Sequence, residues 1–302
     1  MSMPDQTGAE RPVVAFNIIA RRRIPELDRL VAALLAMDGP EPREIFVAVE
    51  TPGTTSPTPT TDADGVHWIA IPARHGIAYN RNRAFDGVTA PLVISVDDDC
   101  LPKPGWLDAM LGAFDDPSVD ATVGSIELPP AGYVGDSISA LGFPAGGSAG
   151  YETMFPVDPD GTTYNISSGN SGMRSDVLRQ LGGWDNSMSW CGEDTELAYR
   201  FGEAGRRIVF VPGATIVHPA RAKIGEFVKW SWVRGRAKAQ LARKVPVSGF
   251  ISNRLKSFGR ILSANARDPK ILLIAPLLAT SILAQQAGFV AEWLFPRQVP
   301  SD

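Results

Sequence analysis

The sequence predicts an α/β fold built on a doubly wound, largely parallel sheet, followed by a helical extension at its C-terminal end. Short apolar runs rich in β-branched residues alternate with segments of helical periodicity in the first hundred residues, which is the pattern of βαβ units. One such run ends on three consecutive aspartates, and ligands of open α/β sheets bind outside the carboxyl ends of the strands. The last eighty residues are first strongly basic and then uncharged, which is typical of a separate helical region.

The first part of the chain contains the most regular alternation. Apolar residues recur at helical spacing between residues 25 and 35, with Pro25 at the start and Gly39 and Pro40 after the end. A second helix is expected over residues 76–85. Residues 51–65 are rich in Thr and Pro and are expected to form a solvated loop. The expected buried strands cover residues 13–19, 44–49, 66–71 and 92–96.

Beyond the aspartates the alternation becomes less regular. Residues 129–163 carry seven glycines and are too long for an ordinary connection, so we expect a functional lid or a mobile loop there. The remaining expected elements are helices over residues 106–114, 175–181 and 195–204 and strands over residues 121–128, 208–211 and 214–217.

Composition excludes several classes of protein. The 302 residues are 44% hydrophobic and 21% charged, enough to bury a large core. The two cysteines lie in no CxxC or His/Cys cluster, which excludes a zinc finger or a disulfide scaffold. The P-loop pattern GxxxxGK[ST] is absent, and no GxGxxG follows the first strand, which argues against those phosphate-binding loops.

The net charge of −4 hides a division between two parts of the chain. Residues 221–270 contain thirteen Lys and Arg against two acidic residues, whereas the rest has sixteen Lys and Arg against thirty-one acidic residues. Such asymmetry points to a polyanionic partner, either nucleic acid or anionic lipid. Residues 271–291 contain no charged side chain, and this length is close to a bilayer span. We therefore expect an anionic membrane surface as the partner and no nucleic acid.

The membrane prediction has several forms. Basic residues directly before an apolar segment favour the cytoplasmic face of a membrane. Pro276 and several polar residues interrupt the apolar segment, so an interfacial helix is as reasonable as a full crossing. A basic solvated helix followed by a core helix packed on the domain is the alternative.

The acidic residues predict the chemistry. Asp97, Asp98 and Asp99 close the run over residues 92–96, and Glu193 and Asp194 open a helical pattern about a hundred residues later. Hard carboxylate oxygens select ions such as Mg²⁺ or Mn²⁺, which commonly also hold substrate phosphates. The pattern therefore suggests a metal, a phosphorylated substrate and a separate base.

Several segments between residues 13 and 218 resemble the glycosyltransferases of family 2, which have the GT-A fold. That fold is Rossmann-like, with a mostly parallel mixed sheet and helices on both faces. The resemblance implies a transferase domain over residues 1–220, followed by a basic amphipathic and hydrophobic membrane-associating region over residues 221–302. The segments that carry it, in the family's order, are VDDDCLPKPGWL at 96–107, SGNSGMR at 168–174, LGGWD at 181–185, GEDTELAYR at 192–200 and VPGATIVH at 211–218.

The resemblance also assigns roles to residues. Asp99 would hold the metal, with His218 as a metal or phosphate contact. Asp97 and Asp98 would supply a further ligand or bind the ribose. Asp194 would be the catalytic base, with Glu193 beside it as the second catalytic candidate. The residues implied to bind the donor are Asp97, Asp98, Glu50 at the end of the second strand, Arg81 and Asn82.

The implied function is metal-dependent, inverting transfer of a sugar from a nucleotide-diphosphate donor to a hydroxyl acceptor that is lipid-linked or membrane-proximal. The cofactor would be Mg²⁺ or Mn²⁺. The sequence departs from the family where a Thr/Ser-x-Asn-Arg turn is common after the first strand, because it has Arg21, Arg22 and Arg23 there. A nucleotidyltransferase of related fold and a non-catalytic membrane adaptor with a degenerate transferase fold are the alternatives.

Overall fold

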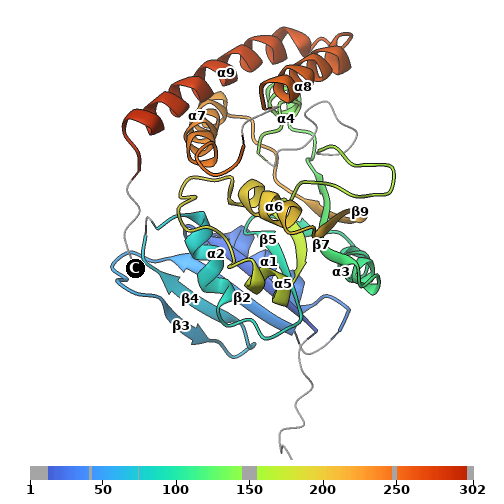
Figure 1. Ribbon diagram of the computed structural model, residues 1–302, viewed down its shortest axis with the longest axis vertical. Helices are drawn as coiled ribbons and strands as arrows, with labels where there is room; N and C mark the ends of the chain where they lie inside the picture. Colours follow the sequence, from blue (N-terminus) through green and yellow to red (C-terminus); the bar gives the residue numbers. More distant parts are fainter. Residues whose placement is uncertain (1–12, 41–42, 74, 145–154, 247–249, 298–302) are drawn as a thin grey trace, which may run out of the picture.

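A single mixed sheet organises the protein (Figure 1). The computed structural model describes residues 13–40, 43–73, 75–144, 155–246 and 250–297. The strand order of the described sheet is β3-β4-β2-β1-β5-β8-β7-β9-β6. β1 pairs in parallel with β2 and β5, and β2 pairs in parallel with β4, whereas β8 is antiparallel to both of its neighbours. The predicted α/β fold with a mostly parallel mixed sheet is confirmed.

The first half of the sheet follows the predicted alternation. Its elements are β1 (Val14–Ala20), α1 (Pro25–Leu35), β2 (Arg43–Glu50), β4 (His67–Ile71), α2 (Ile77–Phe85) and β5 (Leu92–Asp97). The prediction of a plain loop over residues 51–65 was wrong in one part, because β3 (Thr58–Thr61) forms there and pairs antiparallel with β4. All four residues of β3 are exposed, and threonines favour a strand while Pro59 is tolerated at a sheet edge.

The second half contains the short strand β6 (Leu101–Pro102) and two larger elements, none of which the sequence predicted. β8 (Asn170–Arg174) inserts between β5 and β7 (Val119–Glu127), and α4 (Gly132–Ser139) occupies part of the expected long loop. Residues 145–154 of that loop lie outside the described residues. The two short strands expected over residues 208–217 are one strand, β9 (Arg207–Val217), whose register with β7 shifts between Gly124 and Ser125. The other elements are α3 (Trp106–Gly112), the 3-10 turn η1 (Ala113–Asp115), α5 (Ser175–Gln180) and α6 (Glu193–Glu203).

Helices cover both faces of the sheet, and each face has its own apolar core. The α1 and α3 helices bury residues such as Leu30 and Trp106 on one face, and α2, α5 and α6 bury residues such as Phe85 and Phe201 on the other. Successive strand residues alternate between these cores: Val93 belongs to one and Ile94 to the other. Because the chain leaves β1 towards β2 on one side and returns to β5 on the other, a topological switch point lies between β1 and β5.

Three long helices follow the sheet and lie together at one end of the molecule (Figure 1). They are α7 (Ile224–Leu241), α8 (Phe250–Asn265) and α9 (Ile271–Leu294). The α7 and α9 backbones approach so closely that a Cβ atom on Gly288 would lie 2.1 Å from the Trp232 carbonyl oxygen. Such close approach through small residues is characteristic of helix pairs that associate without a strong hydrophobic drive.

The α9 helix distributes polarity in an unusual way. Its buried positions include Ser281, Gln285 and Glu292, whereas Leu272 is 79% exposed and Leu283 is 71% exposed. The buried polar groups are paired: the Ser231 and Ser281 hydroxyls are 2.9 Å apart, and Gln285 donates to Ser281. By length and composition α9 could cross a membrane, although a third of its most apolar stretch is buried within the protein. The side of α9 that faces protein therefore contains polar residues as well as Ile274, Leu277 and Leu278, while large apolar side chains also face outward.

Glu292 fastens α9 to the rest of the chain. Its carboxylate accepts hydrogen bonds from Arg236 Nε at 2.6 Å, Trp190 Nε1 at 2.9 Å, Gln240 Nε2 at 2.9 Å and the Arg297 backbone amide at 3.1 Å. Because Trp190 lies directly before α6, this one carboxylate joins α7, α9 and the sheet domain. Whether residues 1–220 and 221–302 are separate domains stays a prediction.

Replacing Glu292 with Gln should lower the free energy of unfolding by about 2 kcal/mol or more at pH 7, because Arg236 would lose its buried counter-charge. Burial alone would raise the pKa of Glu292, but the hydrogen bonds from Arg236, the Arg297 amide and Trp190 outweigh it and hold the pKa below its ordinary value of 4.5. A depressed pKa stabilises the fold above the unfolded-state value, and this contribution is lost as the pH falls through the folded-state value. Urea titrations of both proteins in mild detergent should therefore show a gap that shrinks below about pH 4.5. Glu226→Gln, which removes a carboxylate that pairs with the exposed Lys223 in the first turn of α7, is the control. An equal gap for both variants would contradict the role of Glu292.

Candidate active site

The aspartate triplet lies at the carboxyl end of β5, next to the switch point. Asp97 is the last residue of the strand, and Asp98 and Asp99 form the turn that follows. Burial, together with the charges of Asp99 and Asp97, raises the pKa of Asp98 to about 7. Three carboxylates in one half-buried turn repel each other, so the turn is suited to receive a cation.

The Ser-Gly-Asn-Ser-Gly segment packs directly against this turn. Asp97 donates its backbone N–H to the Gly169 carbonyl, and a Cβ atom on Gly169 would lie 2.5 Å from the Asp97 carboxylate. Only glycine leaves room for the acid at this point. The Asn170 side chain receives the Trp106 indole N–H at 2.9 Å and donates to the Ala214 carbonyl at 2.8 Å. The Ser-Gly-Asn-Ser-Gly segment therefore supports the aspartate turn through Gly169, while Asn170 ties the segment to its neighbours.

Arg81 joins the aspartate turn to the second acidic cluster. Its side chain is 1% exposed, and its Nη2 lies 3.3 Å from Asp97 while its Nε lies 3.3 Å from Glu193. The Nη1 nitrogen is buried without a hydrogen-bond partner among the described residues. Arg81 is thus a buried bridge between two acids.

Glu193 and Asp194 form the first turn of α6, which begins after Gly192 in a left-handed conformation with φ of 86°. Burial raises the pKa of Asp194, against the lowering effects of the Thr195 backbone amide, Arg234 and Arg81. Burial also raises the pKa of Glu193, the Asp194 charge adds to this, and Arg81 opposes it. Glu193 is held by Arg81, whereas half-buried Asp194 lines an open cavity, so Asp194 is the acid placed to exchange a proton with a ligand.

Asp99 belongs to a group of side chains that could hold a metal ion. The possible ligand atoms of Asp99, Cys100 and His218 lie within 4.8 Å of one another. His218 Nε2 lies 3.3 Å from Asp99, and the opposite ring nitrogen lies 3.0 Å from the Pro219 carbonyl, which would fix the ring with Nε2 free to ligate. Burial raises the pKa of the Cys100 thiol far above its usual range, so it stays a neutral and poor ligand for a hard ion. Asp99 and His218 fit a divalent cation, and Arg221 holds the second Asp99 oxygen at 2.5 Å.

The aspartates border a first cavity of about 680 Å³, which we name the donor cavity. Glu50 at the end of β2 lies in its wall and accepts a hydrogen bond from Asn80 Nδ2 at 3.2 Å. Four arginines reach this cavity from the turn after β1, from the turn after β9 and from the end of α9. They are Arg21, Arg22, Arg221 and Arg297.

A second cavity of about 530 Å³, which we name the helical cavity, opens on the other side of Asp97. Its walls include Arg81, Glu193 and Asp194 at one end and residues of α7, α8 and α9 at the other. Asp97 and Ile77 line both cavities. The structure therefore brings Asp97, Asp98, Asp99, His218, Glu193, Asp194, Arg81 and Glu50 to one region at the junction of two cavities.

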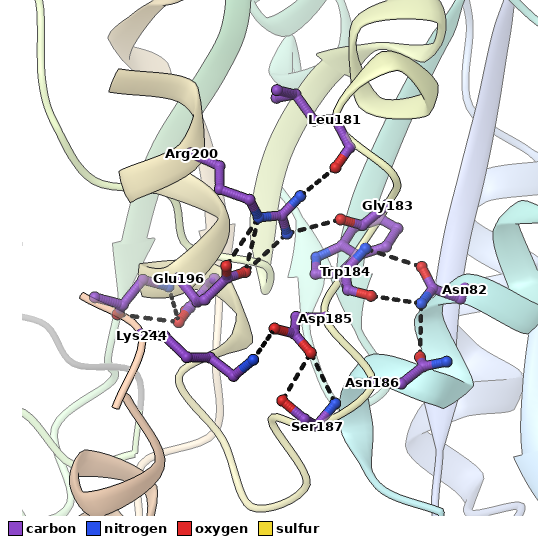
Figure 2. Close-up of polar contacts among 12 residues, drawn as sticks. Asn82, Leu181, Gly183, Trp184, Asp185, Asn186, Ser187, Glu196, Arg200 and Lys244 are labelled. Atoms are coloured by element: carbon purple, nitrogen blue, oxygen red, sulfur yellow. Dashed lines mark hydrogen bonds and ion pairs between the residues drawn. The ribbon is translucent and has the colours of Figure 1, made fainter. Parts of the chain in front are cut away.

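The structure does not support the predicted donor contact of Asn82. Figure 2 shows its amide bound to the Leu-Gly-Gly-Trp-Asp loop instead: Asn82 Nδ2 donates to the Trp184 carbonyl and to Asn186, and its oxygen accepts the Trp184 backbone N–H. Arg200 and Lys244 hold the same loop from α6 and from the end of α7. Asn82 lines neither the donor cavity nor the helical cavity and acts as a scaffold residue.

Sequence reasoning missed three residues of the donor cavity. Asn80 lies two positions before the predicted Asn82 in α2, and only the orientation of the helix distinguishes the two. Arg221 is three residues after His218, and its place directly after that motif was a usable signal. Arg297 reaches the cavity from the opposite end of the chain, and no local pattern predicts it.

Comparisons with known proteins agree with this geometry. The model of the family "Glycosyl transferase family 2" matches residues 16–182. A pre-mycofactocin glycosyltransferase of Mycobacterium tuberculosis is 30% identical over 251 residues, which are 80% of this chain and 50% of that protein. The O-antigen biosynthesis protein RfbC of Myxococcus xanthus is 28% identical over 149 residues, 45% of this chain and 12% of that protein. The chain thus spans about half the length of the mycobacterial relative and 12% of the length of the protein from Myxococcus xanthus.

Two solved structures share the fold. The mannosyltransferase PcManGT of Pyrobaculum calidifontis, in complex with GDP-Man and Mn²⁺, is similar with a TM-score of 0.59 at 17% identity, over 95% of this chain and 88% of that one. GalNAc-T7 with UDP, GalNAc and Mn²⁺ has a TM-score of 0.53 at 13% identity, over 86% of this chain and 59% of that one. Because the family model covers more than half of the residues and the fold agrees, the chain belongs to glycosyltransferase family 2.

Proposed function

We propose that this protein transfers a sugar, with inversion, from a nucleotide-diphosphate donor to a hydroxyl group of a lipid-linked or membrane-proximal acceptor. The observation that carries the proposal is that two cavities share Asp97, with the candidate metal ligand Asp99 in one and a candidate base, Asp194, in the other. A donor in the first cavity and an acceptor in the second would place the anomeric carbon between them.

The donor cavity suits a nucleoside diphosphate. Asp99 and His218 would hold Mg²⁺ or Mn²⁺, and the arginines around the cavity offer further charge to the diphosphate. When bound, the ion would act as a Lewis acid that stabilises the departing diphosphate without proton transfer. Glu50 and Asn80 lie together in the same wall, where they can pair with the base or ribose. The complexes of the two similar structures, with GDP-Man or UDP and with Mn²⁺, support this class of donor.

Asp194 would act as the general base. A bond forms between the acceptor oxygen and the anomeric carbon while the bond from that carbon to the diphosphate oxygen breaks, and the hydroxyl proton passes to the Asp194 carboxylate. Attack from the side opposite the leaving group inverts the configuration. Burial raises the pKa of Asp194, which makes its carboxylate a better proton acceptor. Arg81 and Glu193 position this end of the cavity.

Membrane proximity rests on the C-terminal helices. The outward residues of α9 are apolar and widely exposed, and exposed basic residues of α8 such as Lys256 precede them. A helix with an outward apolar face and neighbouring basic residues binds anionic interfaces. We propose that α9 contacts the cytoplasmic face of a membrane.

Asp99→Asn should abolish sugar transfer, because the variant loses the carboxylate that pairs with His218 at the proposed metal site. We expect the Mn²⁺-dependent rise in melting temperature with GDP or UDP to disappear as well, since ligands stabilise only the native state that binds them. Asp108→Asn, an exposed change on α3, is the matched control. Retention of both transfer and Mn²⁺-dependent stabilisation would remove Asp99 from this role.

Asp194→Asn should lower the rate of transfer by about a hundredfold or more while nucleotide binding with Mn²⁺ stays intact, because the loss of a general base affects the chemical step. Turnover with a panel of donors and acceptors, alongside calorimetric nucleotide binding, separates the two effects. Asp176→Asn, in the exposed first turn of α5, serves as the control. Loss of nucleotide binding together with activity would assign Asp194 to the donor cavity instead.

Leu272→Gln combined with Leu283→Gln should reduce binding to anionic vesicles by about tenfold or more, since each buried leucine contributes about 1.5–3 kcal/mol. Co-sedimentation with vesicles of phosphatidylglycerol and phosphatidylcholine measures this. Leu101→Gln, on an exposed leucine of β6, is the control. Equal sedimentation of all three proteins would contradict a membrane role for α9.

A further inference from the structure

Charge is divided between the two ends of the helical cavity. The end at the sheet carries Asp97, Glu193 and Asp194 around Arg81. The end at the helices carries two cations, Arg234 and Lys238, which lie one turn apart on α7 and line the cavity. Both are half-buried.

Neither cation forms an ion pair within the described part of the chain. The Arg234 guanidinium lies over the Trp230 ring at 4.6 Å from its centroid. Lys238 donates to the neutral amide oxygen of Gln285. Two positive charges facing a partly desolvated space without a carboxylate in contact are stabilised when an anion enters.

The helical cavity also has apolar lining residues near these cations in the sequence and on the neighbouring helices. Side chains from α7, α8 and α9 form this part of the wall, where a hydrocarbon body would find partners of its own polarity. They are Leu241, Phe258, Ile261 and Leu278. The wall of the helical cavity therefore offers a ligand a candidate base, two cations and an apolar surface.

Resting on the proposed function, we propose that the acceptor is an anionic amphiphile: its hydroxyl lies at Asp194, its phosphate or carboxylate binds Arg234 and Lys238, and its apolar body lies among α7, α8 and α9. Arg234 and Lys238 are then residues that select the acceptor. They bind it through charge, whereas the donor cavity binds its ligand with other side chains, so the two sites are separable by mutation.

Equilibrium binding of decyl phosphate to the full chain tests this proposal. Arg234→Gln and Lys238→Gln should each weaken binding by about tenfold, because a charge-assisted hydrogen bond is lost, and Arg234→Lys should restore part of it. Lys229→Gln removes the same charge from an exposed position of the same helix and should bind like the unchanged protein. Decanoate in place of decyl phosphate tells whether a carboxylate serves as well.

Two further ligands test whether the charge and the hydrocarbon chain are both needed for binding. Decyl glucoside, which has the same chain and no charge, should bind weakly and equally to all variants, and inorganic phosphate alone should bind far more weakly than decyl phosphate. Equal binding of decyl phosphate by every variant, or of decyl glucoside and decyl phosphate by the unchanged protein, would overturn the proposal. If inorganic phosphate bound as tightly as decyl phosphate, the claim that an apolar body binds among α7, α8 and α9 would be overturned.

Stabilisation by UDP or GDP with Mn²⁺ separates this result from a failure of the proposed function. The Arg234 and Lys238 variants should keep that stabilisation, which also shows that they are folded. If UDP or GDP with Mn²⁺ did not stabilise the unchanged protein, the result would count against the donor site. If the nucleotides did stabilise it but the variants bound decyl phosphate as the unchanged protein does, only the acceptor assignment would fail.

Discussion

The buried guanidinium of Arg81 is the interaction on which both the fold and the candidate site depend. It pairs with Asp97 at the end of β5 and with Glu193 at the start of α6, residues that lie 16 and 112 positions away in the chain. A charge that is 1% exposed is costly unless it is paired, and the removal of one partner from such a group is strongly destabilising. The Arg81 side chain therefore links α2 to β5 and α6, and the same contacts place the aspartate turn near the start of α6, where Asp194 lies.

Much of the sheet was predictable from the sequence, because the central residues of β1, β2 and β5 are buried on both faces and read as short apolar runs. The unpredicted strand β8 follows a different rule. It carries Gly172, where a Cβ atom would lie 2.7 Å from the Thr122 hydroxyl, and Asn170, which packs against Gly124. Because β8 and β7 approach each other closely at these positions, small and polar residues occupy them. The sequence of β8 therefore shows neither alternation nor an apolar run.

The site residues were predictable as a group but not one by one. Motif order identified the acids because their chemistry requires carboxylates at strand and helix ends. Which of Asn80 and Asn82 lines the cavity depends on how α2 is rotated about its axis, since residues two positions apart on a helix point to opposite sides. Asn80 faces Glu50 in the donor cavity, whereas Asn82 faces the Trp184 loop. Composition likewise revealed an apolar C-terminal helix without revealing which of its faces is buried.

The position of α9 explains why a helix with buried polar residues is stable here. Its middle section contributes Leu278, Ser281 and Gln285 to the helical cavity, and Glu292 near its end binds Trp190, which lines the donor cavity. Arg297, just beyond the helix, enters the donor cavity itself and donates to the Ser189 carbonyl. A purely apolar inner face could pack against α7, but it could not supply these polar walls or hold Arg297 in place. The inner side of α9 therefore combines apolar residues that pack against α7 with polar residues that line the helical cavity and hold Trp190, while its outer side exposes apolar residues.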